Sequence, residues 1–227
     1  MKRYSVCLPS HVYNQERVTL VGPAMATLAR TVHDGNKPML MIIFKNEGNY
    51  NYQMERFSES FDARLVGEPS GVGGTEMTLA WGTQQLFDDG ADYVTWMGDD
   101  ALFHPQWHMK LRKLIEDKSE ALGWSVYRSA YEEFHKTELE EHEYVRVSSL
   151  CGHGMTFSKE EWKLWEIDWR KGFWASPGAD TLDLYHAWVR KGERWTTRVS
   201  YIEHTGRRGV HALPHMPEWA VNFQGCN

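Results

Sequence analysis

The apolar positions of the first hundred residues predict strands that alternate with helices. Tyr4, Val6 and Leu8 are separated by single residues, a spacing typical of a strand, and Pro9 is expected to end it. Apolar residues between 18 and 32 recur at helical spacing, which predicts a helix closed by Gly35. The alternation continues with a strand over 39–44, a short helix over 52–61, a strand over 63–66 and a helix over 75–87. This order predicts an α/β fold in which helices cover parallel strands.

The stretch from Tyr93 to Met97 is apolar apart from one threonine, which predicts a strand buried on both faces. It is followed by Gly98, Asp99 and Asp100. Ligand sites of open α/β sheets lie at the carboxyl ends of strands. Two adjacent carboxylates repel each other unless a cation lies between them, and carboxylate oxygens suit Mg²⁺ or Mn²⁺. We therefore predict a metal site for a phosphate-bearing ligand; the alternative is a simple turn.

The second half of the chain predicts shorter elements. Pro105 is typical of a helix start, and the apolar residues that follow it mark one helical face. Ser158 and Glu161 form a capping box that predicts a further helix start. The remaining expected elements are strands over 122–127 and 144–147, an exposed charged excursion over 128–143, a helix over 180–191 and a strand over 195–202 that leads to His204.

The composition indicates a globular protein without an overall basic field. The 227 residues are 41% hydrophobic and 25% charged, which is ordinary for a single domain with a substantial core. A net charge of −6 disfavours a nucleic-acid partner, although a local basic patch can suffice. The residues that could form such a patch are Lys110, Arg112, Lys113, Arg190, Lys191, Arg194 and Arg198.

The cysteines and the amino-terminal residues indicate the cellular compartment in which we expect the protein. Cys7, Cys151 and Cys226 are odd in number and far apart, which argues against a disulfide framework and a cysteine zinc site. We expect a reducing, cytoplasmic environment. The first residues enter a strand directly, and no apolar run approaches the ~20 residues that span a bilayer, so we expect neither a signal peptide nor a membrane span.

Four segments resemble, in order, the motifs of a GT-A fold glycosyltransferase of the family-2-like group. Residues 90–100 resemble the G-A-D-Y-V-x-x-x-D-D-D run that carries the DXD motif. Residues 152–157 are similar to the glycine-flanked strand before the acceptor-side helix. Residues 178–184 resemble the segment of the catalytic aspartate, and residues 199–204 resemble the late strand whose histidine completes the metal site in some of these enzymes. The resemblance extends from residue 4 to about residue 209.

The resemblance implies a single GT-A domain over 1–227 with a mixed central sheet flanked by helices. Its nucleotide-sugar-binding half covers about 1–105 and its acceptor-side half and tail about 106–227. It also implies a UDP- or GDP-sugar donor and a Mn²⁺ or Mg²⁺ ion on the donor's diphosphate. The ion's implied ligands are Asp100, Asp99 and His204, with Asp99 also placed toward the ribose. The implied donor-binding residues are Pro9, Ser10, His11, Asn46 and Glu47, together with Arg207 and Arg208 as a diphosphate clamp.

Asp180 is the implied general base for an inverting transfer, and Asp183, about one helical turn later, is its competitor. Two positions depart from the family pattern: Gly98 replaces the first aspartate, and Ala179 stands where glutamate is common. The resemblance leaves two kinds of acceptor open: a glycan or lipid-linked sugar, or a hydroxymethylated base of DNA as in phage enzymes, which would then act in the host cytoplasm. The rival hypotheses are a nucleotidyltransferase of the same fold and a non-catalytic sugar- or nucleotide-binding module. A structural role is favoured for His153, and the oligomeric state is left open.

Overall fold

The structure is a computed structural model. It describes residues 2–12, 15–45, 55, 56, 59, 62–70, 72, 75–129, 137–150, 152–170, 192–205, 220, 222 and 223. The helices, strands and contacts described below all lie within these residues.

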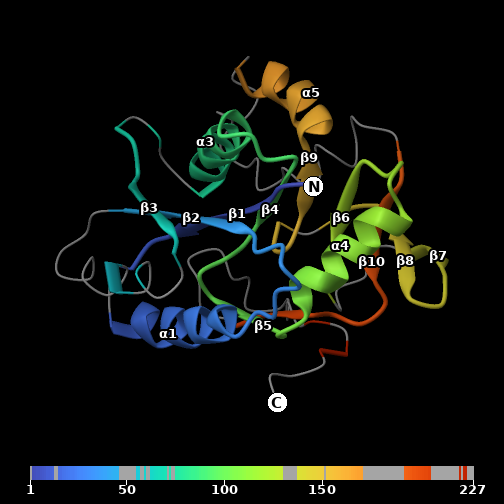
Figure 1. Cartoon of the computed structure of the whole chain (residues 1–227), viewed down its shortest axis with the longest axis horizontal. Helices are drawn as coiled ribbons and strands as arrows, with labels where there is room; N and C mark the ends of the chain where they lie inside the picture. The colour runs from blue at the N-terminus through green and yellow to red at the C-terminus, as the bar shows by residue number, and fades with distance from the viewer. Residues whose placement is uncertain are drawn as a thin grey trace.

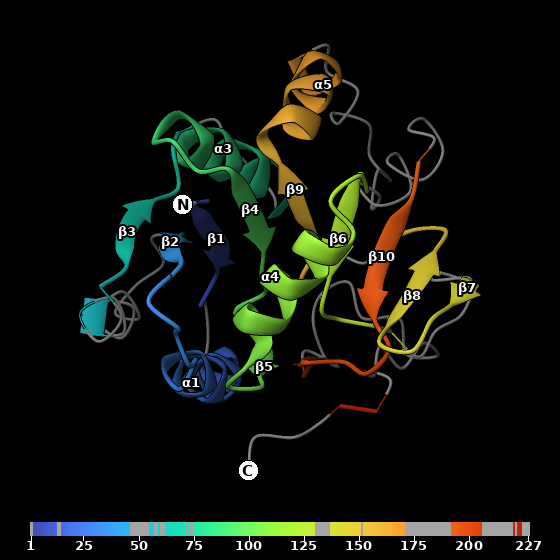
Figure 2. The same ribbon diagram turned by 45° about the vertical axis from the view of Figure 1, so that its right-hand side comes forward.

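A nine-stranded mixed sheet forms the centre of the molecule (Figure 2). Starting from one edge, the first four strands run parallel to one another: β3 (Arg64–Gly67), β2 (Met39–Phe44), β1 (Tyr4–Ser10) and β4 (Tyr93–Trp96). The sheet continues through β9 (Thr156–Ser158), β6 (Gly123–Ser125), β10 (Arg194–Thr197), β8 (Tyr144–Val147) and β7 (Thr137–Glu140). Strand β9 runs antiparallel to both β4 and β6, so it joins the two halves of the sheet. A separate antiparallel pair consists of β5 (Ala101–Phe103) and β11 (Ile202–His204).

Helices cover both faces of the sheet (Figure 1). Helix α1 (Gln15–Ala29) and helix α4 (Trp107–Asp117) pack on one face, in a core cluster that includes Met25 and Leu114. Helix α3 (Thr75–Asp88) and helix α5 (Lys159–Arg170) pack on the other face, where Phe87 and Trp162 lie in a second cluster. The sheet is therefore the middle of three layers, as predicted for alternating strands and helices.

The alternation of side chains explains how β1 serves both faces. Tyr4, Val6 and Leu8 belong to the core cluster with α1 and α4, whereas Cys7 belongs to the cluster with α3 and α5. Successive side chains of a strand point to opposite faces, so a central strand needs apolar residues at nearly every position. Strand β4 meets this requirement as well, since Val94, Thr95 and Trp96 are all buried.

The predicted order of parallel strands is confirmed, but several local predictions were wrong or incomplete. Pro9 does not end β1, which runs to Ser10. Pairing of β1 with β4 stops at Cys7, while pairing with β2 continues through Pro9, so the missing proline N–H lies on an unpaired side. The strand expected over 195–202 is two strands in different sheets, and β5 was not predicted. The expected helix over 180–191 and most of the helix over 52–61 lie outside the described residues.

No helix in the described part of the chain combines the length and apolar character that crossing a bilayer requires.

Candidate functional site

The two adjacent carboxylates lie where β4 leaves the sheet. The Met97 N–H donates to the Cys7 carbonyl at 3.0 Å, which extends the contact with β1 one residue beyond β4. The chain then turns through Gly98, Asp99 and Asp100 into β5. Asp99 and Asp100 are only 4% and 8% exposed. Buried carboxylates need hydrogen bonds or opposite charges, and Asp99 and Asp100 differ in the groups that provide them.

Asp100 lies beside two imidazoles. One ligand atom from each of Asp100, His153 and His204 falls within 4.8 Å of the other two. His204 Nε2 is 3.4 Å from Asp100 Oδ1, and the rings of His153 and His204 stack with centroids 4.0 Å apart. A carboxylate and two imidazole nitrogens converging in this way are a donor set that suits a divalent transition-metal ion.

Strand pairing holds the late histidine in place. His204 is the last residue of β11 and pairs with Ala101, the first residue of β5. The next residue, Thr205, donates its N–H and its hydroxyl to the Asp100 carbonyl at 2.9 and 2.6 Å. The small β5–β11 sheet thus brings a segment from near residue 200 against the turn that follows β4.

A tight turn holds the other histidine. Gly154 follows His153 with a φ of +75°, a conformation that side-chain-bearing residues rarely adopt. Its N–H donates to the Trp96 carbonyl at 2.8 Å, and the Trp96 N–H donates to the Met155 carbonyl at the same distance. These two bonds tie the turn to the end of β4, so His153 reaches the same point as His204.

Gly98 leaves the space that His153 occupies. A Cβ atom at position 98 would lie 2.8 Å from His153 Cε1 and 2.7 Å from Asp100 Oδ1. Both distances are shorter than normal contacts. The residue that departs from the DXD pattern is therefore the one whose missing side chain admits a second imidazole to the cluster.

Asp99 faces away from the two histidines, toward β1 and α1. Its Oδ2 accepts from the Ser10 hydroxyl at 2.8 Å and from the His11 N–H at 3.3 Å. Arg17 of α1 ion-pairs with both carboxylates, through Nη2 to Asp99 Oδ1 and through Nη1 to Asp100 Oδ2 at 3.0 Å. Asp99 is consequently not part of the three-residue cluster, and its role as a metal ligand stays a prediction.

The same burial affects the two carboxyls in opposite directions. Burial raises the pKa of Asp99 and outweighs the opposing charge of Arg17. Burial also acts to raise the pKa of Asp100, but the hydrogen bond and charge of His204, with the charges of His153 and Arg17, hold that pKa well below its usual range. Asp100 is therefore the carboxyl of the pair that holds its negative charge more strongly, and it is the one that faces the imidazoles.

The structure brings together Ser10, His11, Asp99, Asp100 and His204 from the predicted site. Pro9 lies on β1 directly before them. Asn46, Glu47, Asp180, Asp183, Arg207 and Arg208 lie outside the described residues, so their predicted roles stay predictions.

Sequence reasoning missed two residues of this site. Arg17 could have been noticed as the only basic residue in α1, one helix turn beyond the loop that follows β1. His153 was assigned a structural role, because nothing in the local sequence indicates that its turn reaches β4. The one available signal was the glycine on each side of it, Gly152 and Gly154.

The fold defined by this sheet is the GT-A fold of glycosyltransferases. Among solved structures, S. aureus TarS residues 1–349 in complex with UDP-GlcNAc is similar with a TM-score of 0.65 at 11% identity. That match covers 92% of this chain and 60% of TarS 1–349. The match to S. aureus TarS has a TM-score of 0.63 at 10% identity and covers 88% of this chain and 36% of that one.

A third similar structure is GalNAc-T7 with UDP, GalNAc and Mn²⁺, with a TM-score of 0.57 at 9% identity. The match covers 86% of this chain and 42% of GalNAc-T7. The chain thus spans well under two thirds of these proteins, and identities this low establish a common fold only. No protein-family model and no curated protein matches the sequence.

Proposed function

We propose that this protein is a metal-dependent glycosyltransferase that moves a sugar from a nucleotide-sugar to an acceptor hydroxyl. The observation that carries the proposal is the convergence of Asp100, His153 and His204 at the end of β4 in a GT-A sheet. Support comes from the similar structures, since TarS was solved with UDP-GlcNAc and GalNAc-T7 with UDP and Mn²⁺.

The donor set favours Mn²⁺ over Mg²⁺. Mg²⁺ is held mainly by oxygen ligands and keeps several waters, whereas imidazole nitrogens suit transition metals. Asp100 would hold the ion together with His153 and His204, and Asp99 is the predicted additional carboxylate. A bound ion supplies stabilisation of the negative charge that grows on the departing nucleoside diphosphate.

The residues around Asp99 would bind the donor's nucleoside. Ser10 ends β1 and His11 follows it, and the Lys45 N–H donates to the Ser10 carbonyl at 3.2 Å, so the end of β1 lies beside the residue that follows β2. A UDP or GDP moiety at this edge would meet Asn46 and Glu47, which follow Lys45 in the sequence. Arg207 and Arg208, just after β11, would clamp the diphosphate, because guanidinium groups match phosphate oxygens.

The acceptor hydroxyl requires a base, for which we propose Asp180, with Asp183 as the competitor. A base there would give inversion at the anomeric carbon. The proposed acceptor is a glycan or lipid-linked sugar, or a hydroxymethylated DNA base of the phage type, in either case in the cytoplasm.

Metal binding is tested by titrating the purified protein with Mn²⁺ and with Mg²⁺ in a calorimeter, with and without UDP or GDP. We expect Mn²⁺ to bind more tightly than Mg²⁺. Asp100→Asn should weaken Mn²⁺ binding by on the order of 100-fold, because it removes the only charged ligand of the cluster. The exposed Asp117→Asn is the matched control and should bind Mn²⁺ as the wild type does. Wild-type affinity in Asp100→Asn would rule out this metal site.

Sugar transfer is tested by incubating the protein with UDP- and GDP-sugars and following nucleoside diphosphate release. Asp180→Asn should still bind the donor but no longer release nucleoside diphosphate. If only Asp183→Asn has this effect, Asp183 is the general base instead of Asp180. A nucleotidyltransferase would instead release pyrophosphate from a nucleoside triphosphate and a sugar phosphate. A binding module would bind donor and release nothing, whichever aspartate is changed.

A further inference from the structure

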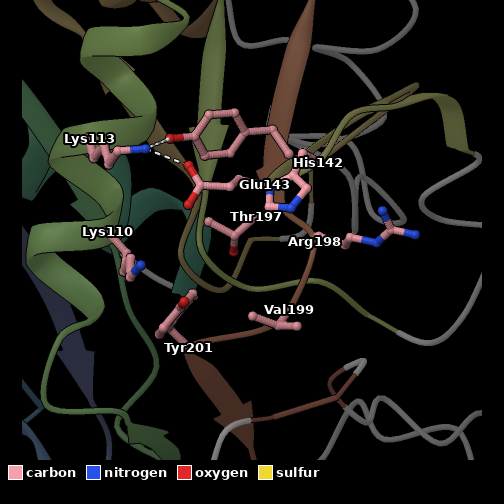
Figure 3. Close-up of a pocket in the computed structure, with 9 residues that line it drawn as sticks. Lys110, Lys113, His142, Glu143, Thr197, Arg198, Val199 and Tyr201 are labelled. Atoms are coloured by element: carbon pink, nitrogen blue, oxygen red, sulfur yellow. Dashed lines mark hydrogen bonds and ion pairs between the residues drawn. The ribbon is translucent and has the colours of Figure 1, made fainter.

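A cavity of about 210 Å³ lies on the side of α4 that faces β8 and β10 (Figure 3). Helix α4 contributes Lys110 and Lys113, the turn before β8 contributes His142 and Glu143, and the end of β10 contributes Thr197. The remaining lining residues are Tyr144, Arg198, Val199 and Tyr201. None of them is a member of the candidate metal cluster.

Lys110 brings to this cavity an ammonium that makes no ion pair with a described carboxylate. It lies 5.6 Å from the centroid of the Tyr201 ring, and Glu143 feels its charge only from beyond ion-pair distance. Lys113 differs, since its Nζ is 2.5 Å from a Glu143 oxygen and 3.2 Å from the Tyr144 hydroxyl. Arg198 extends away from the cavity in Figure 3 and lies 3.4 Å from Glu140. Lys110 is thus the cation left for a ligand.

Thr197 supplies a buried hydroxyl. The residue is 3% exposed, and its Oγ1 has no hydrogen-bond partner among the described residues. Figure 3 shows this hydroxyl and the Lys110 ammonium directed toward the same space. An unsatisfied buried hydroxyl is unfavourable and uncommon in a folded protein, so a ligand that accepts its hydrogen bond explains its presence.

The charge and shape of the cavity select an anion. Lys113 ion-pairs with Glu143 and Asp117, and Arg198 ion-pairs with Glu140, so among the described lining residues Lys110 is the cation without a carboxylate in ion-pair distance. The Lys110 ammonium covers the Tyr201 ring, which leaves that face unsuited to stacking against a sugar. At about 210 Å³ the cavity is smaller than the roughly 300 Å³ at which drug-sized ligand sites begin.

We propose that this cavity binds a phosphate group, with Lys110 Nζ and the Thr197 hydroxyl as its donors. The proposal goes beyond the glycosyltransferase function and does not depend on it, because the cavity needs neither the metal cluster nor a donor. The phosphate can belong to a small phosphorylated compound or to a nucleic-acid backbone, and the two sources share this chemistry.

The test is equilibrium dialysis of the metal-free protein against radiolabelled inorganic phosphate, at constant ionic strength set with NaCl. We expect saturable binding of about one phosphate per chain. Lys110→Gln should weaken it about tenfold or more, because a hydrogen bond to a charged group is lost. Lys163→Gln changes an exposed lysine of α5 and is the matched control, with wild-type binding expected.

Thr197→Val separates binding from folding. Valine has the shape of threonine without the hydroxyl, so this variant should have a Tm equal to or above that of the wild type, while its phosphate affinity falls severalfold. Absence of saturable phosphate binding to the wild type overturns the proposal, and so does wild-type affinity in both Lys110→Gln and Thr197→Val.

A short DNA duplex added as competitor identifies the source of the phosphate. Displacement of inorganic phosphate by the duplex, lost in Lys110→Gln, supports the site with a nucleic-acid backbone as its ligand. Retained phosphate binding without displacement supports the site with a small phosphorylated compound as its ligand.

Discussion

Gly98 shapes the candidate metal centre through the side chain it lacks. An aspartate here would match the DXD pattern more fully, yet any Cβ would press on the His153 ring and on Asp100. The position can therefore hold either a third carboxylate or the second imidazole, and this chain has the imidazole.

We predict that Gly98→Ala and Gly98→Asp each weaken Mn²⁺ binding about tenfold or more, because displacing His153 removes a ligand from its place. Calorimetric titration with Mn²⁺ measures the loss. If Gly98→Asp binds Mn²⁺ more tightly than the wild type, an added carboxylate compensates for the histidine and His153 is dispensable.

His108 places a titratable group in the core. It is 1% exposed, and neither ring nitrogen has a hydrogen-bond partner in the described part of the chain. Burial lowers the pKa of His108 to about 4, aided by the charges of Arg112 and His33 and opposed by Asp34. The Tyr4 ring packs edge-on against it with centroids 5.5 Å apart.

We predict that the protein loses about 3 kcal/mol of stability through His108 as the pH falls from 6.5 to 4. In this window the unfolded chain binds a proton that the folded chain excludes, so stability rises with pH. Urea unfolding across the window measures the slope, and His108→Leu should flatten it. An unchanged slope in His108→Leu would assign the acid sensitivity to other groups.

Two glycines inside helices show when packing outweighs helix propensity. Gly82 of α3 lies against the sheet, where a Cβ would meet Ile43 Cδ1 and would be 2.6 Å from Cys7 Sγ. Ile43 and Cys7 are almost fully buried and have little room to move. Gly22 of α1 differs, since apart from its chain neighbours and the backbone of its own helix no described atom lies within 4 Å of its potential Cβ.

We predict that Gly82→Ala destabilises the protein by about 1–2 kcal/mol, because overpacking exceeds the gain of about 1 kcal/mol in helix propensity. Gly22→Ala is the control without a clash against another element, and its gain should fall below the about 1 kcal/mol of helix propensity, because Pro23 disfavours the helical conformation of a side-chain-bearing residue before it. Denaturant unfolding measures the change in stability of each variant. A stabilised Gly82→Ala would mean that the contact between α3 and β1–β2 is looser than the structure indicates.

The sequence predicted the elements whose pattern is local. Strands β1, β2 and β4 have apolar residues at most positions, and the Ser158 hydroxyl accepts from the Glu161 N–H at 3.1 Å, as the predicted capping box requires. It did not predict β5 or the division of the 195–202 segment, because three- and four-residue strands are defined by distant partners. Asp100 and His204 were predicted because they lie in segments that resemble family motifs. His153 was missed because its turn joins the site through backbone bonds to Trp96, a distant residue in the sequence.

The candidate metal centre joins three parts of the chain that are far apart in sequence. Asp100 precedes β5, His153 precedes β9, and His204 ends β11. An ion bound to all three would connect the nine-stranded sheet to the small β5–β11 sheet. It would therefore stabilise the native state as a whole, since the unfolded chain does not hold the three groups together.

We predict that Mn²⁺ at a free concentration 100 times its Kd raises the free energy of unfolding by about 2.7 kcal/mol, and that EDTA removes this gain. Thermal or urea unfolding with and without the ion measures it. His204→Ala should be insensitive to both Mn²⁺ and EDTA. Equal Mn²⁺ stabilisation of the wild type and His204→Ala would show that the ion acts at some other site.

The pairing of β11 with β5 has a consequence for the chain as it is being made. Thr205 reaches Asp100 across 105 positions of sequence, and closing so long a loop is entropically unfavourable until the sheet has formed. On the ribosome, β1 to β4 and the Asp100 carboxylate emerge long before His204 does. A nascent chain thus cannot assemble the three-residue cluster early, and an ion at the proposed centre would bind only after β11 has paired with β5.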